Sequence, residues 1–265
     1  MTSEQNDLYL RYTMARLSAH RNVWWSFANE YDLIKSKSTD DWEQYAKTVT
    51  ENDPYNHLRS IHNCVEFYDH SKPWITHCSI QRSTEGTNEW RNKYGKPVVI
   101  DEMAYEGNLQ YGWGNISAQE LVRRFWDAAC RGGYGGHGET YLDSNAIWWA
   151  HGGVLKGESP SRIAFLKKII EEAPSGGLRY KPMSWDELCA IPENESEAEE
   201  TGYHLFYFGI MRPSFHNFHF DDEHTYSVDV IDTWNMTVEN IGEFKGAFKT
   251  PLPAREYMAV RLIKS

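Results

Sequence analysis

The sequence predicts an α/β fold followed by a small antiparallel β domain. Over residues 1–180, short apolar segments alternate with helical segments, which is the pattern of a parallel sheet with helical crossovers. From residue 202 onward, short runs with alternating apolar residues and intervening turns are typical of a β-sandwich. Between them, residues 181–201 include a run of glutamates, which is typical of a solvated acidic linker. We therefore expect domains at 1–180 and 202–265, joined by this linker.

The first elements can be assigned from periodicity and capping residues. An amphipathic helix is expected over residues 8–18, followed directly by an apolar strand at 23–27. Ser38 and the acids after it predict the start of a helix that runs to about Glu51, where Asn52-Asp53-Pro54 ends it. The following segments are predicted as strands at 58–62, 74–81 and 97–102, with a helix at 87–94 before the last strand.

The remaining elements complete the count of strand and helix units. A loop rich in glycine and aromatic residues at 105–115 precedes a helix at 117–131, which opens with a capping box. A glycine-rich loop at 132–139, a strand at 146–149 and a helix from residue 159 follow. Five units result, whereas an eight-fold barrel would need three more in front. The later domain should contain strands at 203–210, 226–233, 246–250 and 257–262.

Composition excludes several classes of function. The chain has 265 residues, with 27 Lys and Arg against 38 Asp and Glu, and its formal net charge of −11 argues against a nucleic-acid partner. The four cysteines lack the spacing of a zinc site or a disulfide framework. We expect no metal and no cofactor. Because the polar N-terminus is no signal peptide and no apolar run approaches a membrane span, we expect a cytoplasmic protein without a membrane partner.

Two carboxylic acids follow apolar strands. Glu30 comes after Asn29 at the end of the run from Val23, and Glu102 ends the run Pro97-Val98-Val99-Ile100-Asp101-Glu102. Barrel enzymes keep their chemistry at the C-terminal ends of strands. A retaining glycosidase needs one protonated and one ionised carboxyl group roughly 5–5.5 Å apart. Glu30 and Glu102 are therefore candidate catalytic residues, and Asn29 is placed to hydrogen-bond a sugar hydroxyl.

The chain resembles a known family at these residues. The segments Trp25 to Asp32, Asn52 to Tyr55 and Pro97 to Glu102 are similar to segments of bacterial apiosidase-like glycosidases, within the clan whose (β/α)8 TIM barrels carry the acid/base on strand four and the nucleophile on strand seven. The resemblance implies that Glu30 is the acid/base and Glu102 the nucleophile. It also implies strands four to eight of the barrel, followed by a small β domain that contains Val230 to Thr237.

Strands one to three of such a barrel would be missing from this chain. A parallel sheet open at a barrel edge exposes unpaired backbone and core side chains. We therefore expect either a fragment of a longer gene or a homo-oligomer that covers the open edge. Activity of the chain alone should be impaired, because contacts to the carbohydrate substrate from the first three loops would be lost.

Several further residues are candidates for substrate binding. His62 and Gln81 end strands as the two glutamates do, so they are candidate sugar ligands, and His62 could instead set the proton balance of the carboxylates. Tyr105 follows the second carboxylate strand. One of Trp148 and Trp149 should point inward, where its ring could form the floor of a sugar site. Weaker candidates are Glu106, Glu139 and His151, whereas structural roles are expected for His77, Asp101, Tyr31 and Asp32.

Two other functions remain open. The chain could be a catalytically inactive carbohydrate-binding or interaction protein that descends from a glycosidase, since lineage does not establish activity. A metal-dependent hydrolase that uses His62, His77 and Asp101 is a weaker alternative, because the histidines lack ligand spacing. The sequence gives no indication of the sugar, the linkage or the anomeric configuration.

Overall fold

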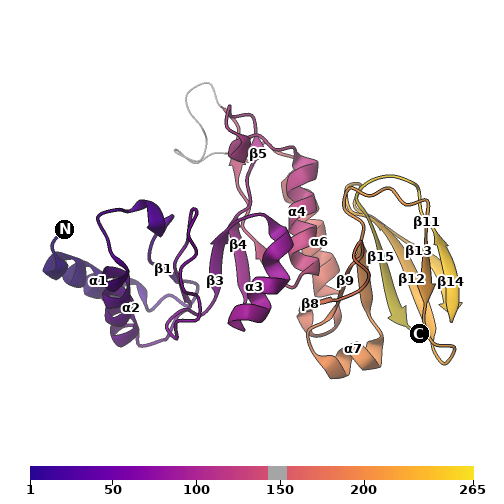
Figure 1. The fold of residues 1–265 in the computed structure, drawn as a ribbon, viewed down its shortest axis with the longest axis horizontal. Coiled ribbons are helices and arrows are strands. Elements are labelled where there is room, and N and C mark those ends of the chain that lie inside the picture. The colour runs from indigo at the N-terminus through magenta and orange to yellow at the C-terminus, as the bar shows by residue number, and fades with distance from the viewer. Residues whose placement is uncertain (143–153) are drawn as a thin grey trace. The chain divides into compact units, whose positions relative to one another are not determined.

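A computed structural model describes residues 1–142 and 154–265, which separate into two compact units of mixed α/β structure (Figure 1). The first unit comprises Met1–Arg82 and Trp90–Asp101, and the second comprises Ser83–Glu89 and Glu102–Ser265. The strand predicted at 146–149 lies outside the described residues. None of the helices within the described residues is long and apolar enough to cross a membrane.

Two helices lie side by side in the first unit, α1 (Ser3–Leu17) and α2 (Thr39–Asn52) (Figure 1). Helix α1 begins well before the predicted residue 8, because Thr2 caps it and its hydroxyl accepts from the Gln5 N–H at 3.2 Å. Helix α2 matches the prediction closely. Ser38 and Asp41 form a capping box at its start, so this boundary is fixed by purely local chemistry.

The strands of the first unit are short and follow one another along the chain. Strand β1 (Trp25–Ser26) pairs in parallel with β2 (Arg59–Ser60), and a parallel bridge from His62 to Ser79 then leads to β3 (Cys78–Gln81). Strand β4 (Val98–Glu102) is the neighbour of β3, and α3 (Thr87–Tyr94) lies between them in the sequence. Their apolar core is formed by Trp42, Ala46, Ile61, Tyr68, Trp74 and Ile75.

Asp53 joins the end of α2 to β1. Its carboxylate accepts hydrogen bonds from the Trp25 indole at 2.9 Å and from the backbone N–H of His57 at 2.8 Å, and it pairs with the His57 ring at 2.9 Å. Burial by itself would raise the pKa of Asp53. The hydrogen bonds from Trp25 and His57 outweigh that effect and lower the pKa to about 2, from an ordinary value of 3.8.

We expect Asp53→Asn to lower the free energy of unfolding by at least about 2 kcal/mol at pH 7. Because the folded-state pKa is depressed, this stabilisation is fully present above pH 3.8 and disappears as the pH falls through about 2. Urea unfolding of wild type and Asp53→Asn should show that the difference in their free energies of unfolding becomes smaller as the pH is lowered from 7 to 2. Asp40→Asn, on the exposed first turn of α2, is the matched control. A difference that stays constant over this pH range would contradict the role given to Asp53.

The second unit begins with short strands and two longer helices. Strand β5 (Glu106–Gly107) pairs in parallel with β7 (Glu139–Thr140), and β6 (Tyr134–Gly135) lies between them in the sequence. Helix α4 (Ala118–Cys130) packs beside α6 (Ser159–Glu171), as Figure 1 shows. Short 3-10 turns complete both units at Tyr31–Leu33, Thr84–Gly86, Gly112–Gly114 and Pro174–Gly176.

The C-terminal part of this unit is a six-stranded antiparallel sheet in the order β13-β12-β15-β10-β9-β8. A two-stranded antiparallel sheet of β11 and β14 packs on it through Phe218, which shares an apolar core with Phe206 and Val228. The strands are β8 (Leu178–Lys181), β9 (Leu188–Pro192), β10 (His204–Tyr207), β11 (Phe215–His219), β12 (Thr225–Asp232), β13 (Thr237–Lys245), β14 (Ala247–Pro251) and β15 (Met258–Lys264).

The segment 181–201, expected as a linker, contains regular structure. The antiparallel sheet already begins with β8, at the start of this segment. Strand β9 lies inside the segment, and its residues Cys189 and Ala190 are completely buried. The glutamate run forms helix α7 (Glu195–Thr201), which Asn194 caps by accepting from the Ser196 and Glu197 N–H groups. Early glutamates also suit the positive end of the helix dipole. The antiparallel part of the chain therefore starts before the expected boundary at 202.

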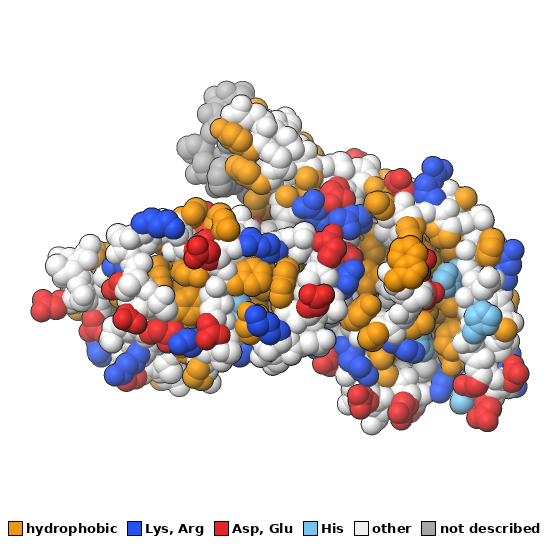
Figure 2. Space-filling model, viewed as in Figure 1, with side chains coloured by type: hydrophobic (Ala, Val, Ile, Leu, Met, Phe, Trp, Pro, Cys, Tyr) orange, Lys and Arg blue, Asp and Glu red, His pale blue; other side chains and the backbone are white. Residues whose placement is uncertain are grey.

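Acidic and basic side chains are interspersed over the face of the molecule that Figure 2 shows, with apolar side chains between them. Several apolar side chains of α1 are exposed, among them Leu8, Tyr9 and Tyr12. The apolar stripe predicted on this helix is therefore mostly on the surface of the described chain, and Met14 is its buried residue.

Candidate active site

Glu30 lies just beyond strand β1, at a point where the backbone takes an unusual conformation. Its φ and ψ of 51° and 54° are left-handed, and it precedes the 3-10 turn Tyr31–Leu33. The left-handed conformation costs roughly 1–2 kcal/mol for a residue with a Cβ atom. Other interactions must hold Glu30 in this conformation, and such backbone strain is found preferentially at functional sites.

His62 supplies those interactions from the end of the neighbouring strand. Its backbone N–H donates to the Ala28 carbonyl at 3.2 Å, and its carbonyl accepts from the Tyr31 N–H at 2.9 Å. Between them, the ring Nδ1 accepts from the Glu30 N–H at 3.3 Å. The His62 residue is only 3% exposed. Three hydrogen bonds from one residue thus surround the Glu30 backbone.

Gln81 contacts the carboxyl group of Glu30. When its amide is oriented to satisfy both of its neighbours, the nitrogen donates to Glu30 Oε1 at 3.1 Å and to the Asn63 carbonyl at 3.1 Å. Asn63 is completely buried, and its side-chain oxygen accepts from the Gln81 N–H at 3.4 Å. The predicted residues Glu30, His62 and Gln81 are therefore brought together, with Asn29 exposed beside them.

Asp32 ties the Glu30 turn to the loop that follows His62. Its carboxylate accepts from three consecutive backbone N–H groups, those of Cys64 at 2.6 Å, Val65 at 2.8 Å and Glu66 at 3.0 Å. Burial opposes the charge of Asp32, but these three donors lower its pKa below the ordinary value. Asp32 therefore has a structural role, in which it connects the Glu30 turn to the loop at residues 64–66.

A second polar group lies beside His62. Ser79 donates to the Asp101 carboxylate, and the charge of Asp101 also interacts with His62 and His77. Burial raises the pKa of Asp101 above its ordinary value, against the opposing effects of Ser79 and the two histidines. Burial likewise lowers the pKa of His77, whose ring contacts the Trp24 ring at a centroid distance of 5.1 Å.

The positions of His62, His77 and Asp101 can be compared with those that a metal-dependent hydrolase would need. Within residues 1–142 and 154–265, no three His, Cys, Asp or Glu side chains gather in a way that could hold a metal ion. His62, His77 and Asp101 interact electrostatically without forming such a ligand set. The described geometry therefore gives the metal-dependent alternative no support.

Glu102 is the last residue of β4 and is half-buried. The carbonyl of Met103, which follows it, accepts a hydrogen bond from Arg124 on α4, and Arg124 is itself paired with Glu120 at 2.7 Å. Ala104 has a positive φ of 74°, so a left-handed residue also lies two positions after the second carboxylate. The backbone on the C-terminal side of Glu102 is therefore fixed by α4.

Tyr105 follows in the same unit. Its N–H donates to the Trp113 carbonyl at 2.8 Å, and the two rings meet edge to face at a centroid distance of 6.2 Å. A Cβ atom at Gly138 would lie 2.6 Å from the Tyr105 ring, so glycine permits the close approach of this loop. The remaining predicted site residues, Trp148, Trp149 and His151, lie outside the described residues.

Glu106 and Glu139 have structural partners instead of a ligand-binding position. Both are 1% exposed. Glu106 accepts from the N–H groups of Glu158 and Ser159, at 2.8 and 3.1 Å, at the start of α6. Glu139 accepts from the N–H groups of Lys156 and Gly157, at 2.7 and 3.1 Å. Their suggested role as loop ligands is thus wrong for the described structure, because backbone donors occupy both carboxylates.

Sequence reasoning missed Asn63 and Ser79. A signal for Ser79 was present: Ser79 and Gln81 are two residues apart on one strand, so their side chains lie on the same face. In this strand the polar pair alternates with the apolar residues Cys78 and Ile80, which are buried. This alternation indicates that one face of the strand points toward a polar site. Asn63 had no comparable signal, because it follows the strand in an irregular segment.

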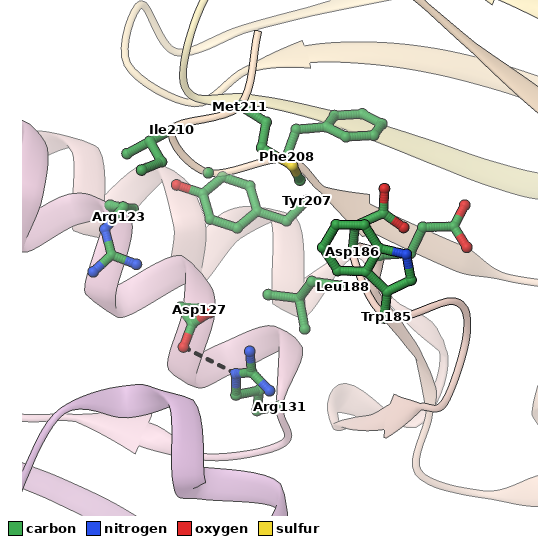
Figure 3. A pocket seen from close by; sticks show the side chains of 12 residues that line it. Arg123, Asp127, Arg131, Trp185, Asp186, Leu188, Tyr207, Phe208, Ile210 and Met211 are labelled. Carbon is green, nitrogen blue, oxygen red and sulfur yellow. Dashed lines mark hydrogen bonds and ion pairs between the residues drawn. The ribbon is translucent and has the colours of Figure 1, made fainter. Parts of the chain in front are cut away.

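A separate hollow of about 230 Å³ lies in the second unit (Figure 3). The exposed Trp185 borders it, and Asp127, Asp186 and Glu187 line it. These carboxylates are already paired: Asp127 with Arg131 at 3.0 Å, Glu187 with His216 at 3.0 Å, and Asp186 with the Ser184 hydroxyl at 2.8 Å. The carboxylates that line the hollow therefore already have structural partners within the protein.

Comparison with known proteins bears on the identity of the chain. Residues 1–193 match the family model described as "Apiosidase-like, catalytic domain", and residues 185–263 match "Domain of unknown function (DUF5605)". The crystal structure of a candidate glycoside hydrolase from Bacteroides vulgatus ATCC 8482 is 36% identical, with a TM-score of 0.90. The match covers 100% of this chain and 56% of that protein, so this chain spans little more than half of that relative's length.

A more distant structure shares the fold alone. The glycoside hydrolase family 5 protein from Bacteroides vulgatus ATCC 8482 is 13% identical, with a TM-score of 0.72 over 100% of this chain and 67% of its own. No curated protein matched the chain. The mixed α/β fold is therefore one that glycoside hydrolases share.

Proposed function

This chain belongs to the family of apiosidase-like catalytic domains, and on that premise we propose that it is a retaining O-glycosidase in which Glu30 is the general acid/base and Glu102 the nucleophile. The observation that carries the proposal is the geometry of Glu30. Its carboxyl group contacts the Gln81 amide, and its strained backbone is held by His62. Strain of this kind is retained where a side chain must point in a particular direction.

The proposed reaction has two steps. Glu30 protonates the glycosidic oxygen while the Glu102 carboxylate attacks the anomeric carbon, so that the glycosidic bond breaks and a glycosyl ester forms on Glu102. Glu30 then removes a proton from water, which attacks the same carbon and releases Glu102. Because Glu30 Oε1 accepts from Gln81, Oε2 is the oxygen that carries the transferred proton. Asn29, exposed beside Glu30, would hydrogen-bond the hydroxyl next to the reacting carbon.

The proposal extends to the fold and to the substrate. Strands β1 to β4 would correspond to strands four to seven of a (β/α)8 barrel, with the antiparallel part as the β-sandwich domain that follows. The substrate class is an oligosaccharide or polysaccharide, with Tyr105, Trp148 and Trp149 as further contacts. An open barrel edge would be covered by a second copy of the chain or by further chain of a longer protein.

The stereochemistry of hydrolysis tests the reaction. We expect at least one member of a panel of aryl glycosides to be hydrolysed, and proton NMR of the first-formed sugar should show the anomeric configuration of the substrate. Inversion would refute the nucleophile role of Glu102. Binding of oligosaccharides in calorimetry, without turnover of any panel member, would instead support an inactive carbohydrate-binding protein.

A further inference from the structure

We propose that His62 is a positioning residue for Glu30, which it holds through the Glu30 backbone as a neutral imidazole with its proton on Nε2. This inference rests on the proposed role of Glu30 as acid/base. It assigns to His62 a task different from the sugar contact that its place at a strand end suggests.

The tautomer follows from the hydrogen bond between the two residues. A backbone N–H is always a donor, so the Nδ1 atom that faces the Glu30 N–H at 3.3 Å must offer a lone pair. In a neutral imidazole the proton is then on Nε2. A ring with a proton on Nδ1 would point its own N–H at the Glu30 N–H, so that two donors would face each other. This holds both for the other neutral tautomer and for the charged imidazolium.

Polar groups of the neighbouring strands also lie near His62. The parallel bridge between His62 and Ser79 brings the two residues alongside each other, and the Ser79 hydroxyl donates to Asp101. The Asp101 carboxylate interacts electrostatically with His62. A negative charge nearby also favours a charged imidazolium, so the hydrogen bond at Nδ1, which needs a lone pair, is the contact that selects the neutral ring with its proton on Nε2.

The hydrogen bond from the Glu30 N–H to His62 Nδ1 stabilises the left-handed backbone of Glu30. Relaxation of Glu30 to a right-handed or extended conformation would relieve the strain of its left-handed backbone. It would also redirect the N–H away from Nδ1 and turn the carboxyl group away from Gln81. The His62 backbone bonds to Ala28 and Tyr31 do not involve the ring, so the side chain is the part of His62 that acts on the Glu30 N–H itself.

The burial of His62 makes a direct sugar contact a poor use of the residue. It is 3% exposed, and its Nδ1 is engaged with Glu30. Misplacement of a catalytic group by about 1 Å costs on the order of 10²-fold in rate. Loss of the ring contact should therefore appear in kcat, with KM little changed.

The tautomer can be observed directly by 15N NMR of the protein labelled in its histidine rings. We expect His62 at neutral pH to show a protonated Nε2 and an unprotonated Nδ1, with the signal assigned by its absence from the His62→Asn variant. A protonated Nδ1 would overturn the inference. This measurement does not require turnover, so it separates the inference from the proposed glycosidase activity.

Two variants then test the positioning role. The Asn side chain can place its oxygen where Nδ1 lies, whereas the Gln side chain can place a polar atom where Nε2 lies. We expect His62→Gln to lower kcat about 100-fold, and His62→Asn to stay within about tenfold of wild type. Thermal unfolding of both variants shows whether they are equally folded. Equal losses in kcat, or a rise in KM alone in both, would overturn the positioning role.

Discussion

Removal of the Glu102 carboxylate is expected to abolish hydrolysis, whereas removal of the Glu30 carboxylate should have an effect that depends on the leaving group. Without the nucleophile no glycosyl ester forms, and we expect Glu102→Ala to lower kcat/KM by at least about 10⁴-fold for every substrate. Glu30→Ala should cost about 10²–10⁴-fold for a poorly acidic leaving group. For a dinitrophenol it should cost little in the first step, because that leaving group needs no proton.

Added azide separates the two roles by product configuration. In Glu30→Ala, azide should attack the glycosyl ester in place of activated water and give a glycosyl azide of retained configuration. In Glu102→Ala, azide should take the place of the missing nucleophile and give the inverted product. Glu51→Gln, which changes an exposed carboxylate on the last turn of α2 in the same unit as Glu30, is the control and should leave the rate near wild type. The opposite assignment of configurations would exchange the roles of the two glutamates.

Glu106→Ala should lower the free energy of unfolding by about 3–5 kcal/mol, because it leaves several buried donors without an acceptor. The N–H groups of Glu158 and Ser159 and the Tyr141 hydroxyl all donate to this carboxylate. Burial opposes its charge, but these donors and the Ser159 hydroxyl lower the pKa of Glu106 below its ordinary value. The negative charge also lies at the positive end of α6, where the helix dipole stabilises it.

Urea unfolding followed by circular dichroism measures this loss. Glu171→Ala is the matched control, because Glu171 is an exposed glutamate on the last turn of the same helix, paired with Lys167 at 3.5 Å. Surface substitutions of this kind usually change stability by less than about 0.5 kcal/mol. Similar losses for the two variants would show that the Glu106 carboxylate has no special part in anchoring α6.

The sequence predicted elements well where their boundaries depend on nearby residues. Helix α2 is an example, because Ser38 starts it and Pro54 follows its end, so no distant contact is needed. Strand β9 was missed because its residues only become a strand through pairing with β8 and β10. The predicted strand at 74–81 begins only at Cys78 for a similar reason: Trp74 and Ile75 pack in the core without joining the ladder.

The candidate site was also predictable only in part, where it depends on which strands are neighbours. Glu30, His62 and Gln81 each lie at or just beyond the end of a strand, so their convergence in one cluster follows from strand adjacency. The left-handed conformation of Glu30 could not be predicted, since no glycine or asparagine marks the position. The anchoring of Glu106 was likewise hidden, because its partners Glu158 and Ser159 are far away in the sequence.

The triple hydrogen bond of Asp32 has a consequence for how a ligand would be selected. The residues it holds, Cys64 to Glu66, belong to a surface loop that three hydrogen bonds to one carboxylate keep ordered. Because the loop is already fixed in the free protein, a ligand that meets it loses little affinity to ordering. Discrimination between ligands at this loop would then depend on complementarity to a preformed shape, and changing it would require remodelling of the loop together with its Asp32 anchor.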